Sequence, residues 1–167
     1  MNMVDCVLEL VVYSNIKRRA VFNRMKPKSA VGITSRFMCN GERHLLFLDI
    51  DGGSSSSKSV FNYLYANKLC NYISVVKTMK GYHVICFNKF KFNDCIKHWR
   101  RLSTFIDPKW INLQIKLKRA NYRSGAILRV SGKYGVKDIV PLLFIVFDDS
   151  DKCVNKLFYQ YLLLVGK

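Results

Sequence analysis

The stretch that most constrains the fold runs from Leu45 to Gly53, where a continuous apolar segment ends in two aspartates and two glycines. An apolar run that stops at turn residues is typical of a strand buried on both faces. Because side chains alternate along a strand, we expect Asp49 and Asp51 to point to the same side. Two neighbouring carboxylates repel each other unless a cation lies between them. The pair therefore predicts a site for Mg²⁺ or Mn²⁺, which bind carboxylate oxygens; the alternative is a strand end with two solvent-exposed aspartates.

The composition predicts one globular domain that binds a polyanion. The chain has 167 residues, of which 50% are hydrophobic, enough for a single core. Its 28 Lys and Arg against 11 Asp and Glu give a net charge of +17, and such self-repulsion destabilises a compact fold. Nucleic acid is the expected partner, since phosphate neutralisation supplies most non-specific affinity. An anionic membrane surface is the rival, but no basic amphipathic helix with a clean apolar face stands out.

The chain lacks the sequence features of membrane and secreted proteins. No apolar run is long enough to span a bilayer, and residues 1–5 lack the basic-then-apolar order of a signal peptide. We therefore expect a cytoplasmic protein. The six cysteines are scattered, with no C-x-x-C and no Cys/His pair at zinc-ligand spacing. We expect them to be reduced core residues, and we expect no structural zinc.

Hydrophobic periodicity predicts helices interleaved with strands. Helices are expected over 57–69, 94–104, from Asp107-Pro108 to about residue 117, and over 151–165, with caps from Ser54–Ser57, Asn93 and Asp107. Strands are expected over 20–23, 30–37, 45–51, 72–78, 82–87, 126–130 and 139–147, while 5–13 fits either a strand or a short helix. Pro141 suggests that the last strand is at an edge. This order predicts a single α+β domain over 1–167, with a central, mainly antiparallel sheet flanked by helices.

Two further segments carry groups that suit a phosphate ligand. His83 follows Gly81, which leaves room for a ligand near the backbone, and Lys80 adds a cation. Arg129 ends a predicted strand and Lys133 follows a small-residue turn. Arginine grips phosphate with two N–H groups, whereas lysine acts as a point charge. An ordinary strand histidine and an ordinary basic loop explain either segment taken alone.

Basic residues gather near the N-terminus and on the two helices expected after residue 93. Each cluster is either a surface that follows nucleic-acid phosphates or a solvated charged face. Aromatic residues nearby, such as Tyr122 and Tyr134, could stack bases. The candidate nucleic-acid contacts are Lys17, Arg18, Arg19, Arg24, Lys26, Arg100, Arg101, Lys116, Lys118 and Arg119.

Taken in order, these motifs resemble the archaeo-eukaryotic primase superfamily, most closely the small primase-polymerase domains of archaeal plasmids and viruses. The family's hydrophobic-Asp-hydrophobic-Asp motif matches 48–51, its small-x-His motif matches 81–83, and its Leu-Arg strand with a nearby lysine matches 128–129 and Lys133. The resemblance covers roughly residues 45–137 and rests on order and spacing. It implies a primase-polymerase core related to the RNA-recognition-motif fold.

The resemblance also implies an activity: a template-dependent nucleotidyltransferase that adds NTPs or dNTPs with two divalent metals, in replication or repair of a small genome. Asp49, Asp51 and a third acid would hold the metals, and His83 would join the first two in catalysis. The incoming nucleotide would contact Lys80, His83, Arg129 and Lys133. Single-stranded or primed DNA or RNA would be the template, and a helicase a possible partner.

The third acid departs from the family pattern. Asp107 follows a hydrophobic residue, but it also suits a helix cap. At 111–112, where a strand-borne acid would be expected, the sequence has Asn112, and Asp138 is a weaker substitute. This departure motivates the alternative of a catalytically inactive relative that binds nucleic acid as a replication accessory or initiation factor. A metal-dependent nuclease ranks third.

Overall fold

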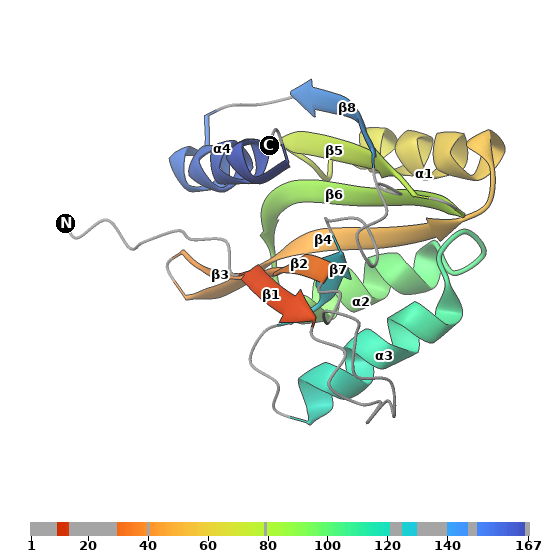
Figure 1. Ribbon diagram of the computed structural model, residues 1–167, viewed down its shortest axis with the longest axis horizontal. Helices are drawn as coiled ribbons and strands as arrows, with labels where there is room; N and C mark the ends of the chain where they lie inside the picture. The colour runs from red at the N-terminus through yellow and green to blue at the C-terminus, as the bar shows by residue number, and fades with distance from the viewer. Residues whose placement is uncertain are drawn as a thin grey trace, which may run out of the picture.

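The computed structural model describes residues 10–13, 30–39, 41–78, 80–120, 125–129, 140–146 and 150–165. An antiparallel sheet of five strands lies at its centre (Figure 1), in the order β3 (Arg36–Met38), β4 (Glu42–Asp51), β6 (Gly81–Phe90), β5 (Tyr72–Lys77) and β8 (Val140–Val146). A second antiparallel sheet has the order β1 (Leu10–Tyr13), β2 (Ala30–Thr34) and β7 (Ile127–Arg129). The helices are α1 (Ser54–Ala66), α2 (Phe92–Arg101), α3 (Pro108–Arg119) and α4 (Lys152–Val165).

The predicted α+β class is confirmed, with one addition. The central sheet is antiparallel and flanked by helices, and β8, which carries Pro141, is its edge strand as expected. The three-stranded sheet was not expected, because its strands β2 and β7 come from distant parts of the sequence, where Gly32 pairs with Arg129. In the described part of the chain, no helix is long and apolar enough to cross a membrane.

One face of the central sheet is covered by α4 over half of its length. Paired residues on neighbouring antiparallel strands share a face, so Tyr72 and Phe87 lie on the same side. Phe158 of α4 stacks on Tyr72 with ring centroids 4.3 Å apart and meets Phe87 edge-on. The hydroxyl of Ser74 donates to that of Tyr161. The other half of this face, beyond the reach of these contacts, carries the Asp49 and His83 pair.

The strand β4 has one edge that its neighbour β3 covers only as far as His44. Beyond that point, α2 and the start of α3 cover it, and Figure 1 shows both helices below β4. Alternate carbonyl groups face this edge and accept hydrogen bonds from Cys95 Sγ to Leu45 (3.8 Å), Trp99 Nε1 to Phe47 (2.7 Å) and the Asp107 N–H to Asp49 (3.1 Å). These bonds satisfy the strand edge in a dry environment and tie Asp107 to the end of β4.

Replacing Trp99 by Phe should lower the free energy of unfolding by about 1–3 kcal/mol, because the buried Phe47 carbonyl loses its donor. The measurement is urea unfolding. The control is Trp110→Phe, since Trp110 packs edge-on against Trp99 but is only half-buried. Equal losses in the two variants would mean that ring volume, not the indole hydrogen bond, stabilises this edge.

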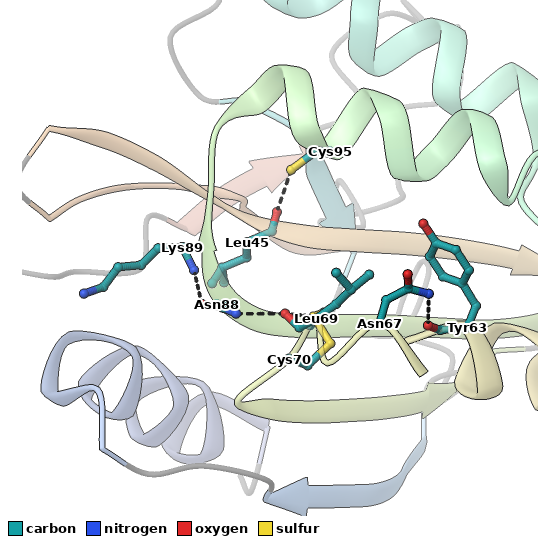
Figure 2. The surroundings of a disulfide bond; sticks show 9 residues. Leu45, Tyr63, Asn67, Leu69, Cys70, Asn88, Lys89 and Cys95 are labelled. Atoms are coloured by element: carbon teal, nitrogen blue, oxygen red, sulfur yellow. Dashed lines mark hydrogen bonds between the residues drawn. A yellow bond between two sulfur atoms is a disulfide. The ribbon is translucent and has the colours of Figure 1, made fainter. Parts of the chain in front are cut away.

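The expectation of six reduced cysteines is wrong for Cys70 and Cys86, which form a disulfide. The bond joins the segment after α1 to β6, and Figure 2 shows its surroundings. Asn88 of β6 donates to the Leu69 carbonyl at 2.9 Å and strengthens the same junction. The pairing could not be read from the sequence, because only the fold brings the two Cα atoms to 5.2 Å. Cys39 and Cys95 are free and buried.

Helix starts follow the sequence at α3 and differ elsewhere. Asp107 is the N-cap of α3, and its side chain accepts a hydrogen bond from the Lys109 N–H. The N-caps of α1 and α2 are Gly53 and Lys91, without side-chain caps, instead of the predicted serines and Asn93. The serines are the first residues of α1 itself.

Candidate functional site

The two aspartates lie at the end of β4, on one face, as the alternation predicted. Asp49 pairs with His83 across the β4–β6 ladder, and Asp51 pairs with Gly81. The side chains of Asp49 and His83 face each other, with Oδ1 and Nε2 3.4 Å apart. The Asp49 carboxylate is 27% exposed and the His83 side chain 8% exposed, so ligands reach the pair from the Asp49 side.

Gly81 serves a different purpose from the one expected. A Cβ built on Gly81 would lie 1.9 Å from the carbonyl oxygen of Ile50. The space beside Gly81 is therefore filled by the main chain of β4, not left open for a ligand. A glycine here lets β4 and β6 approach closely at the point where Asp51 leaves the sheet.

His83 is held by the main chain of β7. Its Nδ1 lies 2.9 Å from the carbonyl oxygen of Arg129. Because a carbonyl only accepts hydrogen bonds, Nδ1 carries a proton, and Nε2 is the nitrogen that faces Asp49. When Nε2 also carries a proton it donates to an oxygen, and when it does not it can accept one. The ring is thus oriented to serve an anionic ligand beside Asp49.

Asp107 comes to the same end of β4 from the connection between α2 and α3. Its N–H donates to the Asp49 carbonyl at 3.1 Å, and Ile106 forms a bridge with Ile50. Its Oδ1 caps α3 by accepting from the Lys109 N–H at 2.8 Å. Both interpretations of Asp107 are therefore consistent with its position: it caps a helix, and it lies beside the aspartate pair.

The electrostatics of the site follow from this crowding of acids. The pKa of Asp51 is raised, first by partial burial and then by the negative charges of Asp49 and Asp107, while Lys80 acts in the opposite direction. A basic protein thus has a local excess of negative charge where a strand ends. Such a site gains from a cation.

The donor set fits a hard divalent cation in part. Carboxylate oxygens suit Mg²⁺ and Mn²⁺, which complete their coordination with water and substrate phosphates. Within the described ranges, no three His, Cys, Asp or Glu side chains are grouped closely enough to hold a metal ion by themselves. A cation at Asp49 and Asp51 would therefore take its remaining ligands from water or from a bound substrate.

Asp51 should make the stability depend on pH. Its raised pKa means that the folded state holds this proton more tightly than the unfolded state does. The stabilisation is fully present below the ordinary value of 3.8 and is lost as the pH rises through the raised pKa of the folded state. Asp51→Asn should therefore become more stable relative to wild type as the pH rises from below 3.8 to neutral. Urea unfolding across that range measures the difference, and a difference that does not change with pH would contradict it.

The structure brings some predicted site residues together and leaves others undescribed. Asp49, Asp51, His83 and Asp107 meet at the end of β4, and Lys80 is close enough for its charge to act on Asp51. Arg129 contributes its carbonyl, which sequence reasoning missed. The remaining predicted residues lie outside the described residues: Lys17, Arg18, Arg19, Arg24, Lys26 and Lys133, and with them the weaker acid Asp138.

The predicted basic residues on α2 and α3 separate into two groups. Arg100, Lys118 and Arg119 line a cavity of about 440 Å³ between the two helices, whereas Arg101 and Lys116 lie outside its lining. The lining also includes Asn93 and Lys97, which sequence reasoning missed. Their spacing from Arg100 is helical and could have indicated a shared face.

Comparisons of the chain with protein-family models, with curated proteins and with solved structures found no match. The function must therefore be argued from the chemistry of the site.

Proposed function

We propose that the protein is a metal-dependent nucleotidyltransferase of the primase-polymerase type, which adds NTPs or dNTPs to a nucleic-acid strand during replication or repair of a small genome. One observation carries the proposal: a pair of carboxylates ends β4 on one face, with His83 opposite and Asp107 alongside. Two acids next to an oriented imidazole suit chemistry on phosphate esters.

Asp49 and Asp51 would hold Mg²⁺ or Mn²⁺, with Asp107 as the third acid. Bound there, the cations supply an activated 3′-hydroxyl and stabilise charge on the leaving pyrophosphate. His83, held by the Arg129 carbonyl, offers Nε2 to a phosphate oxygen when protonated. Lys80 adds a point charge, and the side chains of Arg129 and Lys133 remain predicted nucleotide contacts.

The net charge of +17 supports a nucleic-acid template, since phosphate neutralisation is the main source of non-specific affinity. Single-stranded or primed DNA or RNA would lie on basic surfaces away from the acidic pair. A helicase or another replication protein would supply the opened strand.

A catalytically inactive relative that only binds nucleic acid is the second candidate. It is favoured by the cap that Asp107 provides to α3, which already engages one of its carboxylate oxygens. It is also favoured by the lack of a third close ligand in the described ranges. Such a protein would bind single strands in EDTA and incorporate no nucleotide with any metal.

The test is incorporation of labelled NTPs and dNTPs on primed and unprimed templates, with Mg²⁺, Mn²⁺ or EDTA. The proposal expects longer strands with metal and none with EDTA. No product with any metal would favour the inactive relative, and shortened strands would indicate a nuclease. The variant that ties the product to the aspartates is discussed below.

A further inference from the structure

The groove between α2 and α3 is built from both helices. We call it the α2–α3 groove. Its cationic wall comes from Lys97, Arg100, Lys118 and Arg119, and its floor includes Ile96 and Ile115. The volume of about 440 Å³ is in the range of sites that hold a small organic group. A concave, partly apolar site with cations around it suits a ligand that is apolar in part and anionic in part.

The four cations of the groove are not equivalent. Lys97 pairs with Asp94 at 3.0 Å, and Lys118 pairs with Glu42 while lying 5.4 Å above the Phe92 ring. The bond from Lys118 helps to lower the pKa of Glu42 to about 2, so Glu42 keeps its charge.

Arg100 and Arg119 differ from the two lysines. Both are exposed, and neither forms a salt bridge within the described part of the chain. Their guanidinium groups are therefore the ones available to an incoming anion, and a guanidinium binds phosphate with two N–H groups.

The groove is separate from the acidic pair. It lies toward the C-terminal end of α3, whereas Asp107 caps the N-terminal end of this helix of 12 residues. At 1.5 Å per residue the two ends are about 18 Å apart. A ligand in the groove therefore does not touch Asp49 or Asp51.

We infer that the α2–α3 groove binds single-stranded nucleic acid, with Arg100 and Arg119 on its phosphates and apolar parts of a base or sugar against Ile96 and Ile115. A duplex keeps its bases stacked inside and would leave the apolar floor unused. The Phe92 ring already lies under Lys118, so the floor offers apolar contact but no open aromatic face for stacking. Binding is therefore independent of sequence and sensitive to salt. The inference rests on the nucleic-acid part of the proposed function and not on catalysis.

The experiment measures anisotropy of a labelled oligo-dT strand in EDTA at several salt concentrations. The test variant is Arg100→Ala with Arg119→Ala. The control is Arg101→Ala with Lys116→Ala, which removes the same charge from the same two helices outside the groove. All four side chains are exposed, so both variants should keep the fold, which circular dichroism checks.

The groove variant should bind oligo-dT at least about tenfold more weakly, and its salt slope should fall by about 1.4, or 0.7 for each lost phosphate contact. The control should change affinity by less than about threefold. Equal weakening in both variants would overturn the inference in favour of diffuse charge, and no weakening would show that the strand binds elsewhere.

A competition arm separates the strand from a free nucleotide. In EDTA, a free dNTP at micromolar concentration should not displace oligo-dT; displacement would reassign the groove to a free nucleotide and overturn the inference. The Asp49→Asn, Asp51→Asn variant should bind the strand like wild type. A protein that binds through the groove but incorporates nothing would thus refute the proposed catalysis and leave this inference intact.

Discussion

Replacing Asp49 and Asp51 together by asparagine should lower metal-dependent nucleotide incorporation by at least about 100-fold. The amide is nearly isosteric with the carboxylate but lacks the charge that holds a divalent cation. The measurement is incorporation of labelled nucleotide on a primed template with Mg²⁺ or Mn²⁺. A matched control is Asp94→Asn, because Asp94 is on α2 and pairs with Lys97, away from the site.

Stability provides a second readout for the same variant. Removing two neighbouring charges relieves the repulsion that helps to raise the pKa of Asp51, so the melting temperature without metal should not fall. Added Mg²⁺ or Mn²⁺ should raise the melting temperature of wild type, because it binds only the folded state, and should leave the variant unchanged. Undiminished incorporation by a folded variant would exclude these aspartates from catalysis.

Gly81→Ala should destabilise the protein by about 3 kcal/mol or more, measured by urea unfolding. The added Cβ would lie 1.9 Å from the Ile50 carbonyl oxygen and 3.0 Å from its carbonyl carbon. Both are main-chain atoms, which cannot rotate away as a side chain can. The β4–β6 ladder would have to open where Asp51 pairs with Gly81, so any residual activity should also fall.

The control for this variant is Gly53→Ala. A Cβ at Gly53 meets nothing within 4 Å, and its φ of −84° suits any residue. Its cost should be within about 1 kcal/mol, the range of a changed N-cap. Similar stabilities for the two variants would mean that β4 and β6 do not approach as closely as described.

Local pattern was enough to predict the elements that frame the site. The apolar run before Asp49 predicted a strand buried on both faces, and alternation placed Asp49 and Asp51 on one side. Asp107 and Pro108 predicted the start of α3, because a cap acceptor followed by a residue with no N–H satisfies a helix N-terminus within three residues. These features depend on neighbours in sequence, so the sequence carries them.

The tertiary structure decided what fills the space around those elements. The β2–β7 pairing brings the Arg129 carbonyl to His83, and the α2–α3 connection brings the Asp107 N–H to Asp49. The Gly81 interpretation failed for the same reason, since only the packed ladder reveals which atom lies beside it. Such contacts join residues far apart in the chain, and no periodicity records them.

By itself, the sequence determined a basic α+β chain with a buried strand that ends in two acids on one face. Only the fold decided that His83 is fixed through a main-chain carbonyl, that Cys70 meets Cys86, and that Arg100 and Arg119 line one groove while Arg101 does not. The physical reason is that alternation and helical spacing assign a side chain to a face, whereas its partners depend on which distant segment packs there.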